Sequence, residues 1–265
     1  MRFFIVVFLF YNFQIGICQI KTEDFQLKNI SIENVEYAAI IFDPLQKKYL
    51  ICNDSLAKRK FSPASTFKIA NAIIGLETNV LSDEKQVFEW DGKKRANENW
   101  NQSQDLETAF KNSTVWYFQA LARKIGEKRM SKMLRKLNYD DKDFKINNDI
   151  DSFWLNGNLK KNLFEQVDFV QKLAFKDLAI SKKTYKTIEK IMFSHTIEDV
   201  NIYAKTGWAV NSDLDIGWYI GYAVKSGIKY PFATILVTND YKSFDFQNLR
   251  KEIAFQALRS IGVIH

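Results

Sequence analysis

Four pairs of residues in this chain have the spacing Ser-x-x-Lys, which places a hydroxyl nucleophile one helical turn from an amine that can act as its base. The pairs are Ser55 and Lys58, Ser65 and Lys68, Ser82 and Lys85, and Ser226 and Lys229. Only Ser65 directly follows a Pro-Ala step and begins a strongly apolar helical pattern. Pro63 suits the first turn of a helix, and Ser65 would then meet the positive end of the helix dipole. We therefore expect Ser65 to be a nucleophile and Lys68 to be its base.

A lysine accepts a proton only when its amine is neutral, whereas an ordinary lysine pKa of about 10.4 keeps the amine charged. The neighbours Phe67 and Ile69 are apolar, so the Lys68 amine can be desolvated, and burial lowers the pKa of a lysine. An alternative is that Ser65 only caps the helix. That alternative explains the serine but does not explain a lysine on an apolar helix.

The composition argues against the commoner hydrolytic centres. The chain has two histidines, of which His265 is the last residue and His195 has no Gly-x-Ser-x-Gly motif to serve. We interpret His195 as a loop histidine. The sequence has no His-Glu-x-x-His motif, no cysteine pair at metal-ligand spacing and no glycine-rich phosphate loop. A Ser-His-Asp triad, zinc hydrolysis and nucleotide-dependent chemistry are therefore disfavoured, and no metal is expected.

Two further segments carry residues suited to the same chemistry. Ser113-Thr114-Val115 precedes a helical pattern, where the serine hydroxyl can relay protons. Lys205-Thr206-Gly207-Trp208 ends a strand pattern, where a cation and a hydroxyl can hold a substrate carboxylate and the glycine leaves room for the ligand. A rival segment, Lys225-Ser226-Gly227, lies between two strand patterns. That position is typical of a hairpin turn.

Hydrophobic periodicity predicts strands near both ends of the chain and helices between them. The expected strands are Tyr37–Phe42, Lys48–Ile51, Val200–Lys205, Ile216–Val224 and Pro231–Thr238. The expected helices begin at Pro63 and then cover Thr108–Ile125, Glu127–Leu137, Leu163–Leu173, Lys182–Met192 and Phe246–Ile261. We therefore expect an α/β fold of the α+β type, in which an antiparallel sheet flanked by helices (residues 19–80 and 195–265) receives a mainly helical lobe (residues 81–194). The cleft should lie between these two parts.

The first 18 residues have the order of a secretory signal peptide. The single charge of Arg2 precedes an apolar run, Phe3–Phe10, and then the small residues Gly16 and Cys18. The run is shorter than the roughly 20 apolar residues that span a bilayer. We expect cleavage after residue 18 and export across the inner membrane to the periplasm, with no membrane contact afterwards; a buried N-terminal strand or a lipid-modified Cys18 are the alternatives. Only Cys52 would then remain, so no intramolecular disulfide is expected.

The formal net charge is +7, from 38 Lys and Arg against 31 Asp and Glu. The basic residues are spread along the chain and often lie beside acids, as in Asp140-Asp141-Lys142-Asp143. This pattern indicates a solvated surface with a locally cationic cleft that favours anionic small molecules. No nucleic-acid partner is expected, and the protein is expected to be a monomer or a homodimer.

Taken in order, these segments resemble the class D β-lactamases (the oxacillinases), a branch of the serine β-lactamase and penicillin-binding protein superfamily. The resemblance rests on Ser65-Thr66-Phe67-Lys68, Ser113-Thr114-Val115 and Lys205-Thr206-Gly207, with Ser-x-Val where class A enzymes have Ser-Asp-Asn. The further matching segments are Asp151-Ser152-Phe153-Trp154-Leu155, Glu165-Gln166-Val167 and Asp215-Ile216-Gly217-Trp218. The resemblance covers nearly all of the chain after the leader.

The resemblance implies hydrolysis of the β-lactam ring of penicillin-type antibiotics through a Ser65 acyl-enzyme, and hence antibiotic resistance. It also implies that Lys68 reacts with carbon dioxide to form a carbamate, which acts as general base and is held by the indole N–H of Trp154; no other cofactor is implied. The backbone N–H groups of Ser65 and Trp208 would form the oxyanion hole. The other implied residues are Ser113 and Lys205 in catalysis, Val115, Thr206, Gly207, Trp208 and Arg250 in substrate binding, and Phe67, Tyr139 and Leu155 in support.

Two segments depart from the family's pattern. Tyr139-Asp140-Asp141 replaces the usual Tyr-Gly-Asn, and Lys161-Asn162 replaces a commoner apolar-Ser pair. These changes bear on turnover rate and substrate range more than on acylation. Two other functions share the fold: a β-lactam sensor that is acylated and then stalls, and a penicillin-binding transpeptidase or a catalytically silent binding protein. Such sensors are joined to a membrane-spanning receptor half. The expected cleavable leader of this chain is not such a segment, so the sensor is the less favoured function.

Overall fold

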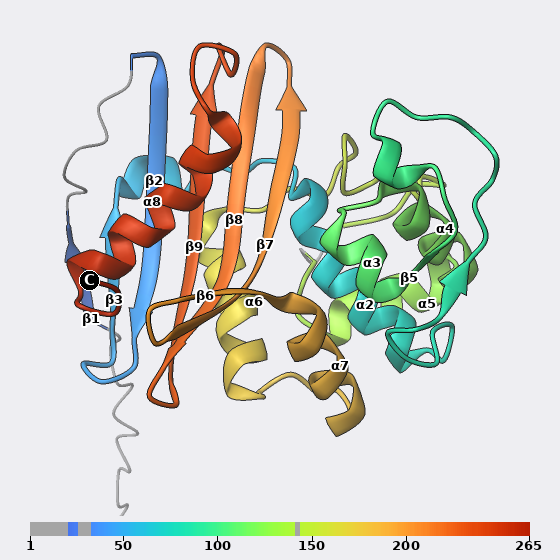
Figure 1. Ribbon diagram of the computed structural model, residues 1–265, viewed down its shortest axis with the longest axis horizontal. Helices are drawn as coiled ribbons and strands as arrows, with labels where there is room; N and C mark the ends of the chain where they lie inside the picture. The colour runs from blue at the N-terminus through green and yellow to red at the C-terminus, as the bar shows by residue number, and fades with distance from the viewer. Residues whose placement is uncertain (1–20, 26–32, 141–143) are drawn as a thin grey trace, which may run out of the picture.

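The computed structural model describes residues 21–25, 33–140 and 144–265 of the chain. The expected signal peptide therefore lies outside the described residues. A seven-stranded sheet occupies one side of the molecule and a group of helices occupies the other (Figure 1). The strand order is β1-β3-β2-β9-β8-β7-β6, so strands from the two ends of the chain are neighbours in one sheet.

The strands of the large sheet are β1 (Lys21–Asp24), β2 (Val35–Asp43), β3 (Lys48–Cys52), β6 (Phe193–Ile197), β7 (Val200–Asn211), β8 (Leu214–Lys225) and β9 (Ile228–Thr238). A two-stranded ribbon in the helical part consists of β4 (Val87–Phe88) and β5 (Gln104–Asp105). The helices are α1 (Asp54–Ala57), α2 (Lys68–Glu77), α3 (Leu106–Lys111), α4 (Val115–Ile125), α5 (Glu127–Lys136), α6 (Leu163–Phe175), α7 (Lys182–Met192) and α8 (Phe246–Ser260), with 3₁₀ turns η1 (Ala64–Phe67) and η2 (Glu98–Trp100).

The central strands are apolar on both faces because helices cover both faces. Along β8, Trp218, Ile220 and Tyr222 belong to the core shared with α2 and α6. The alternate residues Tyr219 and Ala223 belong to a second core under α8. In Figure 1, α8 crosses the front of the sheet and α6 lies behind it. This two-sided burial explains why the strand patterns read as nearly continuous apolar runs.

The expected sheet of distant segments is confirmed, with two differences in detail. β1 pairs with β3 in parallel, whereas every other neighbouring pair of described strands is antiparallel. The edge strand β6 was not expected, because its residues are mostly polar. His195 consequently lies on β6, opposite Ile202, and not in a loop. The segment at Ser226 is the turn between β8 and β9, as expected.

The expected single helix over Thr108–Ile125 is wrong in one respect. The structure has two helices, α3 and α4, which are separated at residues 112–114. Ser113 adopts a left-handed backbone conformation with φ of 54°, which a continuous right-handed helix does not allow. Ser113 therefore belongs to neither helix, and α4 begins at Val115.

Candidate active site

The expected nucleophile and base, Ser65 and Lys68, are in direct contact. Ser65 lies in η1, and Lys68 is the first residue of α2. Lys68 Nζ lies 2.6 Å from Ser65 Oγ. The Ser65 side chain is partly exposed, whereas Lys68 has no exposed surface. The hydroxyl therefore faces the solvent side of the pair, and the amine lies beneath it.

The surroundings of Lys68 favour a neutral amine. Burial lowers the pKa of Lys68 from 10.5 to about 7, because the low-dielectric interior disfavours the charged form. The ring centroid of Phe118 on α4 lies 5.4 Å from Lys68 Nζ. No carboxylate forms an ion pair with Lys68 among the described residues. A substantial share of the amine is therefore unprotonated near neutral pH.

The three rival Ser-x-x-Lys pairs lack this environment. Lys58 and Lys85 are exposed, and each forms an ion pair with nearby acids. Lys229 donates a hydrogen bond to the backbone carbonyl of Ala174. Only the Ser65–Lys68 pair joins a partly exposed hydroxyl to a fully buried amine. The helix-cap alternative also fails, since Pro63 is the N-cap of η1 and no side-chain cap bond is present.

A second pair of a hydroxyl and an amine is brought to the same place. Lys205 Nζ on β7 lies 3.0 Å from Ser113 Oγ and 3.0 Å from the carbonyl oxygen of Thr206. The loop of Ser113 is fixed to β5, because Thr114 Oγ1 donates a 2.8 Å hydrogen bond to Gln104 Oε1. The ring of Phe110 lies beneath Lys205 Nζ at 5.6 Å. The two lysines thus share one design, an amine beside a serine hydroxyl and over a phenylalanine ring.

Basic side chains gather around Lys205, and the locally cationic cleft expected from the sequence stays a prediction. Burial is the largest cause that lowers the pKa of Lys205 well below its ordinary value. The positive charge of Lys68 is the next cause, followed by the charges of Arg250 and Lys251. The cluster favours an anionic ligand.

Strand β7 presents an open edge to the nucleophile. Its pairing with β6 stops at Tyr203, and the following residues pack against η1. Gly207 permits this approach, since a Cβ atom at that position would lie 3.0 Å from both the Pro63 carbonyl oxygen and Thr66 Cγ2. Any side chain at Gly207 would therefore push the strand away from η1. Thr206, just before it, is partly exposed.

Arg250 on α8 is tied to the same strand. Its Nη1 donates a hydrogen bond of 2.9 Å to the carbonyl oxygen of Gly207. The side chain is largely buried, and its burial lowers the pKa of Arg250 from 12.5 to about 10. The guanidinium lies over the ring of Phe246, 5.9 Å from its centroid. The sequence-predicted arginine is therefore placed beside Lys205-Thr206-Gly207.

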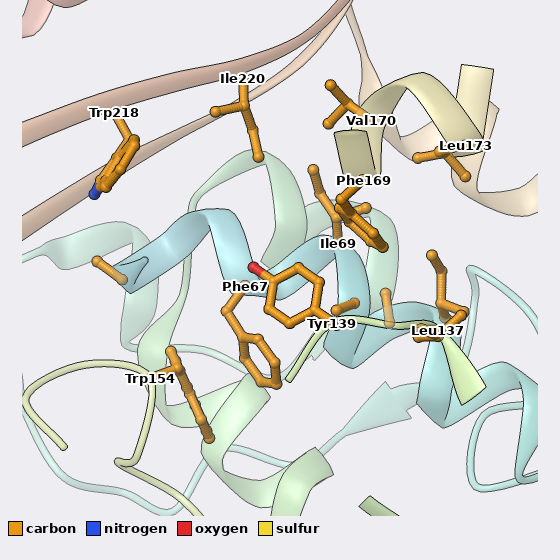
Figure 2. Packing of buried hydrophobic residues seen from close by; sticks show 14 of the residues in the cluster. Phe67, Ile69, Leu137, Tyr139, Trp154, Phe169, Val170, Leu173, Trp218 and Ile220 are labelled. Atoms are coloured by element: carbon orange, nitrogen blue, oxygen red, sulfur yellow. The ribbon is translucent and has the colours of Figure 1, made fainter. Parts of the chain in front are cut away.

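The remaining expected residues form an aromatic wall beside η1. Trp154 stacks on Phe67 with ring centroids 5.0 Å apart, and Tyr139 contacts the other side of that ring at 5.6 Å (Figure 2). The Trp154 carbonyl accepts a 2.9 Å hydrogen bond from the N–H of Ala64, which joins the loop to η1. Val115 and Leu155 are partly buried. Trp154 Nε1 is buried and has no hydrogen-bond acceptor in the described part of the chain.

Several contributors to the site were given no role by sequence reasoning. Phe110 and Phe118 lie under the two lysines, but their spacing is that of ordinary core residues. Gln166 Nε2 on α6 donates a 2.9 Å hydrogen bond to Thr66 Oγ1 and so supports η1 from behind. Of the two departures, Asp140 is partly exposed and Asp141 lies outside the described residues. Lys161 is buried over the ring of Tyr139 at 5.0 Å.

The other sequence expectations concern histidine, metals and membranes. His195 Nδ1 is 2.9 Å from Ser194 Oγ, and its ring packs against Phe255. Neither contact involves a residue of the two serine–lysine pairs. In residues 21–25, 33–140 and 144–265, no group of three or more potential ligands is placed to hold a metal ion. None of the helices in this part of the chain is both long enough and apolar enough to cross a bilayer.

Comparisons of this chain with known proteins all find β-lactamases or penicillin-binding proteins. A model of the family described as penicillin binding protein transpeptidase domain matches residues 34–259. The β-lactamase OXA-48 of Klebsiella pneumoniae is 38% identical over 208 residues, which are 78% of this chain and 77% of the relative. The crystal structure of a class D β-lactamase from Sebaldella termitidis is 32% identical, with a TM-score of 0.86 over 93% of this chain and 99% of that one. The C-terminal domain of the BlaR penicillin receptor of Bacillus licheniformis is 27% identical, with a TM-score of 0.83 over 93% and 99%.

Replacement of Lys68 by methionine is expected to stabilise the protein in a pH-dependent way. In carbon-dioxide-free buffer the unfolded chain keeps the Lys68 proton up to about pH 10.5, whereas the folded protein releases it near pH 7. The stability of the wild type relative to Lys68→Met should therefore be lowest below pH 7 and should rise between pH 7 and 10.5. At pH 6 the variant should gain roughly 4 kcal/mol in the free energy of unfolding, and by pH 9.5 most of that gain should be gone. Denaturant unfolding at the two pH values measures the difference.

The matched control is Lys85→Met, which removes the exposed lysine of a rival pair. That variant should show no comparable gain at either pH, because surface ion pairs contribute little. A gain for Lys68→Met that is equal at pH 6 and pH 9.5 would show that the amine is not held near pKa 7.

Proposed function

The chain belongs to the class D β-lactamases of the penicillin-binding protein transpeptidase family, and from this we propose that it hydrolyses the β-lactam ring of penicillin-type antibiotics through an acyl-enzyme on Ser65 and so confers antibiotic resistance. The observation that carries the proposal is the 2.6 Å contact between Ser65 Oγ and the fully buried amine of Lys68. This contact would supply a nucleophile and a base, since burial lowers the pKa of Lys68 to about 7 and so leaves part of the amine unprotonated near neutral pH.

In the acylation step, the base at Lys68 accepts the proton of Ser65 as Oγ attacks the lactam carbonyl carbon. The carbon–nitrogen bond of the ring then breaks, and the nitrogen atom requires a proton. We assign the delivery of that proton to Ser113, and its 3.0 Å hydrogen bond with Lys205 supports the assignment. Neither pair includes a histidine, so the two lysine–serine contacts divide the proton transfers between them.

The negative charge that develops on the carbonyl oxygen needs donors that are fixed in advance. We assign this role to the backbone N–H groups of Ser65 and Trp208. The close approach of β7 to η1 at Gly207 supports the assignment, since Ser65 belongs to η1 and Trp208 follows Gly207 on β7.

Substrate binding is assigned to the cations of the cleft. The carboxylate of a penicillin would meet Lys205, Thr206 and Arg250, and a planar guanidinium suits a carboxylate particularly well. The apolar residues Val115 and Leu155 would line the space opposite, with Phe67 behind them. Because no acidic side chain pairs with Lys205 or Arg250 in the described part of the chain, both basic groups are available to a ligand, and an anionic ligand would favour the charged form of Lys205.

The residues also fit a carbon-dioxide-derived carbamate on Lys68. A neutral amine is the form that reacts with carbon dioxide, and burial provides it in this site. Trp154 Nε1, a buried donor without an acceptor among the described residues, would hold the modified side chain against the ring of Phe67. The modification supplies an anionic oxygen base that can serve both acylation and deacylation.

A second candidate function is that of a β-lactam sensor, which the likeness to the BlaR penicillin receptor favours. Both functions require acylation of Ser65, and they differ in whether the ester is then hydrolysed. We also retain cleavage after residue 18, export to the periplasm, and the division into a sheet part (residues 19–80 and 195–265) and a helical lobe (residues 81–194) as parts of the proposal.

Purified protein mixed with a chromogenic cephalosporin should turn over many molecules of substrate per molecule of protein. Ser65→Ala should form no acyl adduct in intact-mass measurements and should lose turnover, because the variant lacks the hydroxyl that is paired with the neutral amine. The matched control Ser82→Ala, from an exposed rival pair, should behave as the wild type. A single burst equal to the protein concentration, with a stable adduct on Ser65, would contradict hydrolysis and favour the sensor.

Bicarbonate should restore activity to protein from which carbon dioxide has been removed at low pH. Trp154→Phe keeps the ring that stacks on Phe67 but lacks the indole N–H, so it should need a higher bicarbonate concentration for half-maximal recovery. The measurement is the initial hydrolysis rate against bicarbonate concentration, with sodium chloride at equal ionic strength as control. If the wild-type rate does not respond to bicarbonate, the carbamate assignment is wrong.

A further inference from the structure

The carboxylate of Asp215 makes a contact that the mechanism above does not use. Asp215 lies near the start of β8 and is only 8% exposed. Its Oδ1 accepts a 2.7 Å hydrogen bond from Nε1 of Trp208. No basic side chain forms an ion pair with it in the part of the chain that the structure describes. A buried carboxylate is costly unless it is hydrogen-bonded, and the indole N–H of Trp208 supplies such a bond.

The strand register explains how the two side chains meet. Trp208 is opposite Gly217, and Asp215 is opposite Val210. Residues opposite one another or two apart along a strand share a face, so Trp208 and Asp215 point to the same side of the sheet, the side that α8 covers. Gly217 leaves space on that face, because a Cβ atom there would lie 2.9 Å from the ring of Phe246.

From Trp208 the contacts continue through α8 and return to β7. The Trp208 and Phe246 rings lie with centroids 4.9 Å apart. Arg250 covers the Phe246 ring at 5.9 Å and donates to the carbonyl oxygen of Gly207. Trp208, Phe246, Arg250 and Gly207 therefore form a closed circuit of contacts around one peptide unit, the bond between Gly207 and Trp208. Asp215 joins this circuit through its hydrogen bond to Trp208.

That peptide unit contains the N–H assigned to the oxyanion hole. The described residues contain no cis peptide bond, so the N–H of Trp208 points away from the Gly207 carbonyl in the same plane. Arg250 fixes the carbonyl end, and the Trp208 side chain fixes the Cα that follows the N–H. A shift of the indole would tilt the plane and move the donor from the position where charge develops.

We propose that Asp215 is a positioning residue for catalysis, which holds the Trp208 indole and thereby keeps the Gly207–Trp208 peptide aligned as oxyanion donor. This inference rests on the proposed acylation of Ser65. Asp215 touches no reacting atom, so its effect passes through Trp208. Removing an oxyanion donor outright costs about 10²- to 10³-fold in rate, and misplacing one should cost less.

The kinetic test compares Asp215→Ala with Asp215→Asn. Asparagine keeps an oxygen that can accept from the indole, so its acylation rate should stay within about threefold of the wild type, whereas Asp215→Ala should lose about 10- to 100-fold. The loss should fall on the acylation rate and on the affinity for a boronic acid transition-state analogue together, with KM little changed. Trp208→Phe should show a similar loss, and the double variant with Asp215→Ala should lose no more than either alone.

A merely structural role predicts a different outcome. Asp43 is a matched control, because it is also buried and accepts hydrogen bonds from the backbone of its turn, far along the sheet. Asp43→Ala should lower the melting temperature without changing the acylation rate. If Asp215→Ala behaves in that way, or if its losses add to those of Trp208→Phe, the positioning role is excluded.

An NMR measurement separates this inference from the proposed function. The Trp208 indole proton, assigned by its loss in Trp208→Phe, should exchange slowly in the wild type and in Asp215→Asn and rapidly in Asp215→Ala. If the protein forms no acyl adduct at all, the proposed function fails, and Asp215 cannot position an oxyanion donor whatever the exchange rates. If acylation is normal in Asp215→Ala although its indole proton exchanges rapidly, only the positioning role fails.

Discussion

The desolvation of Lys68 is the constraint on which the site depends. An amine with no exposed surface and no carboxylate partner among the described residues destabilises the folded state whenever it is charged. The apolar packing of α2 offsets this cost, since Ile69, Ala70, Ile73 and Ile74 beyond Lys68 are all fully buried. The same burial that makes the lysine unfavourable for stability makes it a base near neutral pH. Stability is exchanged for reactivity at this position.

The rest of the fold brings partners to that amine from distant parts of the chain. Lys68 is the first residue of the buried helix α2. The second hydroxyl lies in a left-handed turn at Ser113, and Lys205 lies on the open edge of β7. Gly207 lets β7 approach η1, and α8 on the far face holds the same strand through Arg250. The helical part contributes α2 and the turn at Ser113, the sheet contributes β7, and α8 covers the opposite face of the sheet. The site is therefore a property of how these layers pack, and no single layer contains it.

Much of this could be predicted from the sequence, because apolar periodicity and helix context are local. The helices at Lys182–Met192 and Phe246–Ser260 and the strands β2, β3, β8 and β9 lie close to where their patterns placed them. The break at Ser113 was missed because apolar residues recur at helical spacing on both sides of it. The contact between Asp215 and Trp208, and the rings beneath the lysines, depend on strand register and on packing between distant elements. Neither register nor packing is visible in one sequence.

Burial of Lys68 should keep its amine neutral at working pH, and the titration of that amine measures this directly. NMR of protein labelled at the lysine side-chain nitrogen and adjacent carbon, recorded in carbon-dioxide-free buffer with Lys68→Met to assign the signal, follows the Lys68 resonance with pH. We expect a midpoint near pH 7. A midpoint near 10, as for an exposed lysine, would contradict the proposed chemistry, because the buried amine would then be charged and could not take the Ser65 proton.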